Sequence, residues 1–210
     1  MAQQGGLGAA FFNTSIDEFY EVNHLAVKDA LRQIDRFYRE ISKYPDQVGV
    51  ATNAEEVRAL RREGKIAGIL AIEGALAIES DLGVLRMFHR LGLREMNLVH
   101  LLGNNIGDVM HSSENGGMGY GLTEYGRELV AEMNRLGILI DLSHTADQTI
   151  FDVMAASTQP VVTTHSGVRA LVDRAGNWSD EMIRTLARMN GVICAAFLPQ
   201  QVSREYDAKW

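Results

Sequence analysis

The chain has 210 residues, of which 46% are hydrophobic and 22% are charged. These values are ordinary for a globular domain and exclude a disordered tail, a collagen-like fibre and a disulfide-stabilised scaffold. The 27 acidic residues outnumber the 20 basic ones, which gives a formal charge of −7. This balance argues against nucleic acid as a partner, because phosphate binding needs clustered Lys and Arg.

Three features of the sequence predict a cytoplasmic location. No apolar run approaches the roughly 18 residues of a membrane span, so no association with a membrane is expected. The start of the chain lacks the basic-then-apolar pattern of a signal peptide. The single cysteine, Cys194, lies in an apolar run, and we expect it to be a buried thiol in a reducing compartment.

The first predicted elements are a strand and a long helix. Residues 6–12 are mostly apolar and predict the strand. Ser15 and Glu18 form a capping box that predicts the start of the helix, and apolar residues then recur at three- and four-residue spacing. Pro45 ends the predicted helix.

The same alternation of helix and strand continues along the chain. Asn53 and Glu56 form a second capping box and open a helix that is expected to end near residue 63. Residues 66–72 are apolar except for Gly68, which predicts a strand buried on both faces. Further helices are expected over 81–91, 123–136, 146–156 and 179–189, and further strands over 96–99, 138–140, 161–164 and 192–197.

Alternating apolar strands and amphipathic helices predict an α/β fold of parallel βαβ units. Two architectures fit this order, an open doubly wound sheet and a (β/α) barrel. The first strand is not followed by G-x-G-x-x-G, and no G-x-x-x-x-G-K occurs, which disfavours the nucleotide-binding versions. No linker, low-complexity tract or internal repeat divides the chain, so we expect one domain over residues 1–210.

Polar residues follow several of the predicted strands at the point where each strand ends. The carboxyl ends of parallel strands meet at one edge of the sheet, where α/β proteins place their active sites. A carboxylate and imidazoles gathered there are suitable ligands for Zn²⁺. The residues at these positions are Glu73, His100, Asp141, His144 and His165.

Each of these residues also has a structural interpretation. Glu73 is either a ligand or a charge of the following loop, although its burial without a partner would be costly. His144 and His165 are either metal ligands or structural loop histidines, and their equivalent positions after consecutive strands bring the metal interpretation level with the structural one. His100, taken alone, is better explained structurally. Asp141 is a candidate to orient a ligating histidine.

Five short motifs occur in order and at suitable spacing. They are Ile-Glu-Gly at 72–74, Asn-Leu-Val-His at 97–100 leading to Asn-Asn at 104–105, Gly-Leu-Thr at 121–123 with Gly-Arg at 126–127, Asp-Leu-Ser-His at 141–144 and Thr-His-Ser at 164–166. Together they resemble the renal, or membrane, dipeptidase family of zinc metallopeptidases, within the amidohydrolase-like barrel enzymes. The resemblance covers residues 5–199.

The resemblance implies a (β/α)8 TIM-type barrel that hydrolyses dipeptides with two zinc ions bridged by a glutamate. By this resemblance Glu73 is the bridging carboxylate, and His144 and His165 hold one of the two ions. His100 is implied to be a catalytic, substrate-binding residue that polarises the scissile carbonyl or its oxyanion. A water made acidic by the metals is implied to be the nucleophile.

The sequence departs from the family pattern at three places. The His-x-Asp pair of the family's first strand and the aspartate of its eighth strand have no counterpart, so we expect six of eight strand–helix units and one three-ligand zinc position. Gly176 precedes Asn177 where the family has a substrate-binding arginine, which leaves Arg174 and Asn177 as the candidate substrate contacts. The two missing strands would leave exposed sheet edges. Three outcomes are then open: copies of the chain associate through these edges, the ends of the chain rearrange to cover them, or the chain is a fragment of a longer product.

We therefore expect a metallodipeptidase that acts on small dipeptides with reduced turnover, because general acid–base catalysis typically contributes roughly 10²- to 10⁴-fold. Two alternatives stay open. One is a catalytically inactive remnant or binding domain of the same fold. The other is a related amidohydrolase acting on N-acyl amino acids, since the region around Gly176 is where the ends of a substrate would be recognised.

Overall fold

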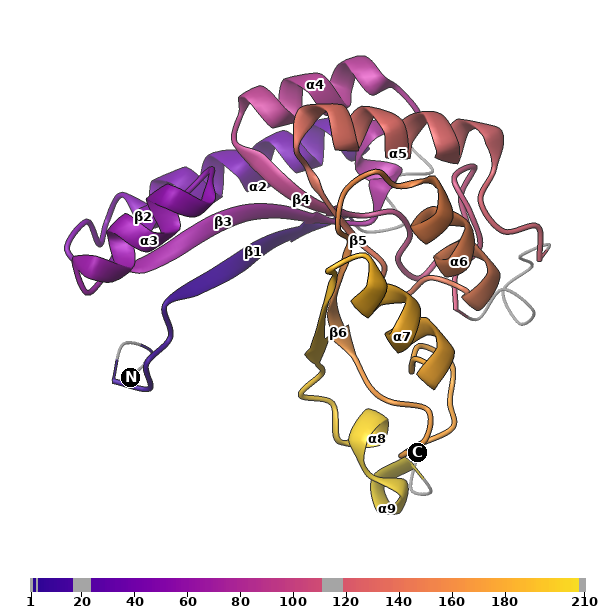
Figure 1. Cartoon of the computed structure of the whole chain (residues 1–210). Coiled ribbons are helices and arrows are strands. Elements are labelled where there is room, and N and C mark those ends of the chain that lie inside the picture. Colours follow the sequence, from indigo (N-terminus) through magenta and orange to yellow (C-terminus); the bar gives the residue numbers. More distant parts are fainter. Residues whose placement is uncertain (1, 3, 17–23, 111–118, 208–210) are drawn as a thin grey trace. The chain divides into compact units, whose positions relative to one another are not determined.

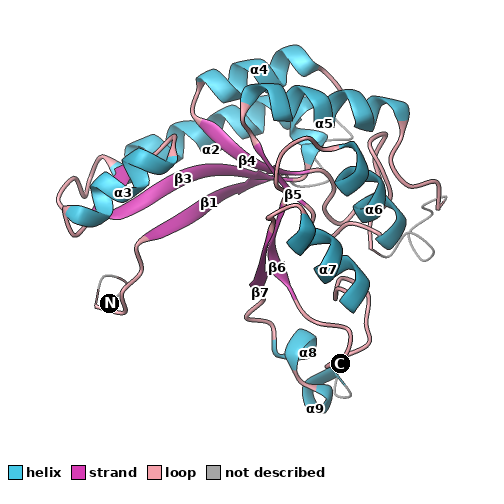
Figure 2. Ribbon diagram, viewed as in Figure 1, coloured by secondary structure: helices cyan, strands magenta, loops and turns pink. Residues whose placement is uncertain are grey.

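The computed structural model describes all residues except 1, 3, 17–23, 111–118 and 208–210. The chain divides into two compact units, Met1–Met96 and Asn97–Trp210. Both contain strands that pair in parallel and helices that connect them (Figures 1 and 2). The α/β class predicted from the alternating sequence pattern is therefore confirmed.

The central strand of the first unit is β3 (Ile66–Glu73). β1 (Ala9–Ser15) pairs with it in parallel from Ala67 to Glu73, and β2 (Val48–Val50) and β4 (Leu93–Asn97) also pair with it in parallel. Because β3 has strands along both edges and helices close by, six of its eight residues are buried. The predicted strand over residues 66–72 is confirmed.

The glycine that interrupts the apolar run of β3 is explained by close packing. A Cβ atom at Gly68 would lie 2.8 Å from Cδ1 of Ile41 and 3.3 Å from Cε2 of Phe12. Phe12 in turn packs edge to face on Phe37 of α2 (Ala26–Ile41), with ring centroids 5.6 Å apart. The absence of a side chain at Gly68 lets α2 approach the sheet.

The helices of the first unit begin at the residues that the sequence indicates, with one exception. The Asn53 side chain accepts a hydrogen bond from Glu56 N at 2.9 Å and caps α3 (Ala54–Arg62). Asp81 caps α4 (Leu82–Arg90), and a short 3-10 helix, η1 (Ala75–Ile78), precedes it. The prediction of one helix from Ser15 to Pro45 is wrong, because β1 extends to Ser15 and α2 begins only at Ala26. Glu18 of the predicted capping box lies outside the described residues.

The second unit continues the alternation. β5, β6 and β7 pair in parallel in that order. The Thr123 hydroxyl accepts from Gly126 N and caps α5, and Gly137, at a φ of 73°, ends it. The elements are α5 (Glu124–Leu136), β5 (Leu139–Asp141), α6 (Asp147–Ala156), β6 (Val162–Ser166), α7 (Asp180–Arg188), β7 (Val192–Ala195), α8 (Pro199–Val202) and α9 (Arg204–Asp207).

Three sequence predictions in this part of the fold need correction. β4 runs from Leu93 to Asn97 rather than over 96–99, because Leu98 and Val99 are buried in a loop and not in the strand. β7 ends at Ala195, two residues earlier than predicted. Cys194 is exposed and not a core thiol, since β7 pairs only with β6 among the described strands and most of its residues face solvent.

Each unit has a core of large, fully buried side chains. In the first unit these include Leu70, Ile72, Ile78, Leu85, Phe88 and Leu93, and in the second Leu98, Ile106, Leu129, Met133 and Trp178.

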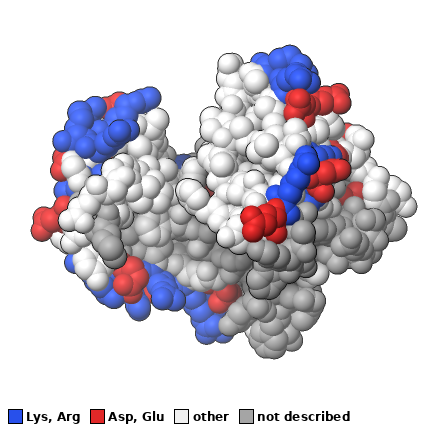
Figure 3. All heavy atoms as spheres, turned by 90° about the horizontal axis from the view of Figure 1, so that it is seen from below, with Lys and Arg blue, Asp and Glu red and all other residues white. Residues whose placement is uncertain are grey.

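Charged side chains of both signs lie close together on the surface, and on the face drawn in Figure 3 small blue and red groups alternate with larger uncharged areas. Several are ion pairs within one helix, such as Arg39 with Asp35 and Arg184 with Asp180. Exposed pairs of this kind contribute little to stability, typically below about 1 kcal/mol. Of the helices that the structure describes, none combines the length and the apolar character that a membrane span requires.

Candidate metal centre

Three histidines of the second unit lie together. His100 is in the loop after β4, His144 is in the turn after β5, and His165 is the fourth residue of β6. The ring centroids of His100 and His144 are 4.7 Å apart and those of His144 and His165 are 4.8 Å apart, edge to face in both pairs. Nε2 of His144 and Nε2 of His165 are 2.8 Å from one another. The structure thus brings together all three histidines that the sequence placed at strand ends.

The backbone of His144 has an uncommon conformation. Its φ is 65°, in the left-handed region that residues other than glycine rarely adopt. The turn is held by neighbouring chain: the His144 carbonyl accepts from Met110 N at 2.7 Å, and Thr145 forms an antiparallel bridge with Val109. Such backbone strain persists where the surrounding structure enforces it, and it concentrates at functional sites.

A buried carboxylate ties the end of β5 to β6. Asp141 is fully buried, and its Oδ1 accepts hydrogen bonds from Ser143 N at 2.9 Å, Ser143 Oγ at 2.8 Å and Thr164 N at 3.0 Å. Its Oδ2 accepts from the Thr164 hydroxyl, which in turn lies 2.9 Å from Nδ1 of His165. Two successive hydrogen bonds through the Thr164 hydroxyl therefore connect the Asp141 carboxylate to the imidazole of His165.

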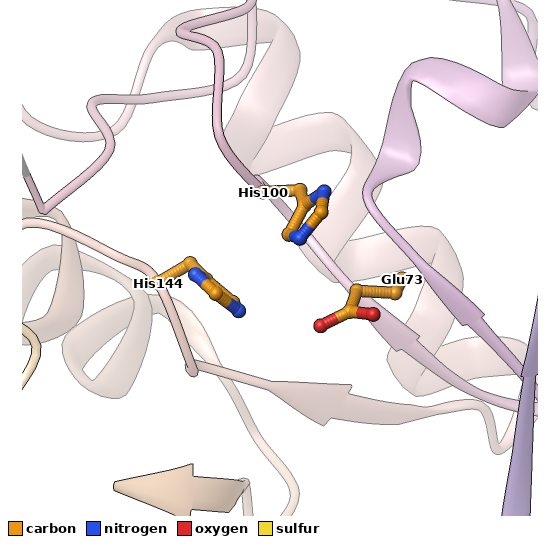
Figure 4. Close-up of side chains that lie close together, drawn as sticks. All are labelled: Glu73, His100 and His144. Atoms are coloured by element: carbon orange, nitrogen blue, oxygen red, sulfur yellow. The ribbon is translucent and has the colours of Figure 1, made fainter. Parts of the chain in front are cut away.

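Glu73 is the last residue of β3 in the first unit and is half-buried. Gly74, at a φ of 95°, turns the chain directly after it, so the carboxylate stands where the strand ends. Figure 4 labels Glu73 together with His100 and His144. The role of Glu73 as a ligand that it shares with His144 and His165 stays a prediction.

The donors of the histidine cluster fit a divalent metal ion. Zn²⁺ in proteins is held mainly by imidazole nitrogen, thiolate and carboxylate oxygen. The two facing Nε2 atoms of His144 and His165 form a hydrogen bond only if one of them carries a proton and the other a lone pair. A metal ion would replace that shared proton, because both nitrogens can then direct a lone pair to the same point.

A cavity of about 160 Å³ adjoins two of these histidines within the second unit. His144 and His165 form part of its wall, and Arg174 adds a cationic side chain. Met110 and Leu198 make another part of the wall apolar. The cavity therefore offers a cation and apolar surface next to the imidazoles, which suits a small molecule with a carboxylate and a nonpolar group.

Arg174 and Asn177, the predicted substrate contacts, occupy different environments. Arg174 lines the cavity. Asn177 is buried, and its amide nitrogen donates to the carbonyls of Val172 at 2.8 Å and Gln201 at 2.9 Å. The structure thus shows Asn177 bracing the loop, and a contact of Asn177 with substrate stays a prediction.

The glycine at position 176 is required by the local backbone. Gly176 has a φ of 82°, and a Cβ atom there would lie 2.6 Å from Sδ of Met110. A side chain at this position is therefore strained by the backbone and also collides with Met110. The cationic side chain in the wall of the cavity is that of Arg174, two residues before this glycine.

An ion pair holds the loop that carries Arg174. Arg169 donates to both carboxylate oxygens of Asp147, at 2.6 and 2.8 Å, and to the carbonyl of Asn177 at 3.1 Å. The hydrogen-bonded carboxylate of Asp147 raises the pKa of Arg169, against the opposite effect of partial burial. The bidentate geometry fixes the orientation of both side chains.

Two residues of this site could not be identified from the sequence pattern. Met110 lies in a glycine-rich loop, where no pattern indicates that it would face the cavity. Thr164 carries a usable signal, because a hydroxyl directly before a candidate ligand can bond to the imidazole, but the Thr-His-Ser motif by itself indicates no role for that hydroxyl.

The family model of the membrane dipeptidases (peptidase family M19) matches residues 1–209. The chain therefore belongs to the membrane dipeptidase family, as its five motifs indicated.

Curated relatives are dipeptidases of about twice the length. The chain is 32% identical to dipeptidase tcpJ of Claviceps purpurea (strain 20.1), over 96% of this chain and 49% of that protein. It is 31% identical to dipeptidase verJ of Clonostachys rogersoniana, over 96% of this chain and 54% of that protein. The chain thus spans about half the length of the curated relatives that it matches.

A solved structure supports the fold assignment. A metallopeptidase from Rhodobacter sphaeroides, crystallised with a phosphinate mimic of the dipeptide L-Ala-D-Ala, matches with a TM-score of 0.87 and 28% identity. The match covers 97% of this chain and 65% of that one. This likeness and the family membership confirm an α/β fold of the incomplete (β/α)8 barrel type.

Proposed function

We propose that the chain takes part in the metal-dependent hydrolysis of dipeptides, with Glu73, His144 and His165 as ligands of one divalent ion. The observation that carries this proposal is the convergence of the Nε2 atoms of His144 and His165 at 2.8 Å, with His100 beside them. Membership of a dipeptidase family supports the reaction class. Zinc is the proposed ion, because imidazole and carboxylate together are typical zinc ligands.

His100 also lies beside His144, with ring centroids 4.7 Å apart, so this third imidazole needs a role in the proposal. We assign His100 to the substrate and His165 to the ion, because the His165 nitrogen faces that of His144. A bound divalent ion lowers the pKa of a water molecule and polarises a carbonyl group. The imidazole of His100 would donate a hydrogen bond to the carbonyl oxygen of the scissile amide and stabilise its developing negative charge.

The cavity supplies the remaining substrate contacts in this proposal. The guanidinium of Arg174 binds the carboxylate of the dipeptide, and the apolar surface of Met110 and Leu198 takes a side chain. The solved relative that was crystallised with a mimic of L-Ala-D-Ala supports a substrate with small side chains.

The test is hydrolysis of Ala-Ala dipeptides by the zinc-loaded protein, followed by chromatography of the released alanine. Glu73→Ala and Glu73→Gln are expected to lower the rate by more than the roughly 10- to 100-fold that is typical for partners outside the ligand shell. Glu63→Ala, which removes an exposed carboxylate after α3, is the control and is expected to keep the wild-type rate. Equal rates for the Glu73 variants and the wild type would refute the metal role of Glu73.

A wild-type protein that binds zinc but releases no amino acid would instead support a non-catalytic domain of the same fold.

A related amidohydrolase of N-acyl amino acids is the second candidate, favoured by the backbone at Gly176. The family pattern has an arginine where this chain has Gly176, and here Arg174 is the cationic residue of the cavity wall. The surroundings of the substrate carboxylate would therefore differ from the family pattern. An N-acyl amino acid carries the same carboxylate but lacks the free amine of a dipeptide. Comparing L-Ala-D-Ala with N-acetyl-D-alanine separates the two candidates, since a dipeptidase is expected to cleave only the first.

We also propose that copies of the chain associate through β7. The strand pairs only with β6 among the described strands, and apolar side chains at and beyond it face solvent. Val192 is 54% exposed, and Phe197 is fully exposed. An unpaired strand edge with apolar neighbours favours pairing with another chain.

A further inference from the structure

The buried carboxylate of Asp141 is surrounded by hydrogen-bond donors. The backbone amides of Ser143 and Thr164 donate to Oδ1, at 2.9 and 3.0 Å, and so does the Ser143 hydroxyl at 2.8 Å. The Thr164 hydroxyl donates to Oδ2. An ionised carboxylate only accepts hydrogen bonds, and these four donors match that state.

The hydroxyl of Thr164 has a single proton, which it donates in a hydrogen bond to Oδ2 of Asp141. The same oxygen lies 2.9 Å from Nδ1 of His165. Since a hydroxyl has one proton and two lone pairs, Thr164 Oγ1 can only accept at this second contact. When Thr164 donates to Asp141, the proton of the second hydrogen bond is the one on Nδ1 of His165.

We propose that Asp141 and Thr164 are positioning residues that hold the proton of His165 on Nδ1 and so keep the lone pair of Nε2 directed at a metal ion. A neutral imidazole has one N–H, so a proton fixed on Nδ1 leaves Nε2 as the acceptor. That Nε2 atom faces His144 and the cavity. The inference rests on the proposed metal site for its purpose, but the proton position itself is a property of the metal-free protein.

The neighbouring imidazole must have the opposite arrangement when no metal is bound. Nε2 of His165 accepts, so Nε2 of His144 donates across the 2.8 Å contact. The two histidines are therefore not equivalent. His165 is preorganised as a ligand, whereas His144 has to move its proton when an ion binds.

A reversed chain of hydrogen bonds is the competing arrangement. It requires a protonated Asp141 that donates to Thr164, a Thr164 hydroxyl that donates to Nδ1, and a proton on Nε2 of His165. Two backbone amides and the Ser143 hydroxyl already donate to Oδ1 of Asp141, and hydrogen bonds to a charged acceptor are stronger than those to a neutral one. The first arrangement is favoured for this reason.

The first experiment measures the proton position in the wild-type protein. Long-range 1H–15N correlation NMR of the 15N-labelled, chelator-treated protein, at a pH where the imidazoles are neutral, reports which ring nitrogen carries the proton. The signals of His165 are assigned by their loss in His165→Asn. The expected result is the Nδ1–H form of His165. The Nε2–H form would overturn the proposal.

The second experiment compares zinc affinity in three variants by calorimetry. Thr164→Val removes the hydroxyl at nearly constant shape and is expected to weaken binding about 10- to 100-fold. Thr164→Ser restores the hydroxyl and is expected to bind like the wild type. Thr163→Val is the matched control, because the Thr163 hydroxyl bonds to Ser143 and Ser166 and does not contact the imidazole.

Two results of this series would overturn the proposal. One is wild-type affinity in a folded Thr164→Val protein, and the other is an equal loss in Thr163→Val, which would mean a general loosening of β6. Failure of the proposed function gives a different result. If the wild type binds no zinc, the proposed metal site is wrong. The proton position measured by NMR then still decides whether Asp141 and Thr164 orient His165.

Discussion

The strands β3 and β7 have similar sequences and opposite environments. Both are short apolar runs, Ile-Ala-Gly-Ile-Leu-Ala-Ile in one and Val-Ile-Cys-Ala in the other. β3 pairs with strands along both edges and buries six of its eight residues. β7 pairs with β6, and three of its four residues are exposed. An apolar run therefore predicts a strand. It does not predict whether other parts of the chain bury the side chains of that strand.

The largest difference between β3 and β7 is expected in how much a substitution lowers the free energy of unfolding. Leu70 in β3 is fully buried, so Leu70→Ala should lower the free energy of unfolding by about 2–5 kcal/mol. Val192 in β7 is 54% exposed, and Val192→Ala should change it by no more than about 0.5 kcal/mol. Urea unfolding monitored by circular dichroism measures both. A comparable loss for Val192→Ala would show that β7 is covered in solution.

The next effect concerns association of copies through β7. Phe197→Asp should weaken self-association about 10- to 100-fold, since burying a phenylalanine contributes roughly 1.5–3 kcal/mol and about 1.4 kcal/mol corresponds to a factor of ten. Met87→Asp, on an exposed position of α4, is the control and should leave association unchanged. Sedimentation velocity over a concentration series provides the measurement. A wild-type protein that stays monomeric at high concentration would rule out this interface.

The smallest effect is expected at an exposed helix start in the unit of β3. The backbone N–H of Thr52 donates to Glu56 and holds the pKa of this carboxyl below its usual range. Because the pKa is lower in the folded state, the ionised group stabilises the fold at neutral pH, and the contribution disappears as the pH falls through the folded pKa. Glu56→Gln should cost a few tenths of a kcal/mol at pH 7.

The same variant gives the pH test. The difference in unfolding free energy between Glu56→Gln and the wild type should shrink when the unfolding is repeated at a pH below the usual range of glutamate. A difference that does not change with pH would mean that the charge of Glu56 contributes nothing.

The sequence was sufficient to predict features that depend on neighbouring residues or on the order of strands and helices along the chain. The caps at Asn53, Asp81 and Thr123 follow from short-range hydrogen bonding. The meeting of His144 and His165 follows from the common direction of parallel strands.

What could not be predicted depends on contacts between distant parts of the chain. Cys194 lies in an apolar run, yet its exposure is decided by which strands pair with β7. The left-handed backbone of His144 is enforced by Met110, which is 34 positions away in a loop without a recognisable pattern. The path from Asp141 to His165 requires the register of β5 against β6, which no local motif encodes.

The most direct test of the metal site is X-ray absorption spectroscopy at the zinc edge on the zinc-loaded protein. The proposed centre should show scattering from two imidazoles at about 2.0–2.1 Å together with carboxylate oxygen. His144→Asn should remove one imidazole from this coordination shell, and so should His165→Asn. A coordination shell that contains no imidazole, or one that neither substitution changes, would contradict the proposed centre.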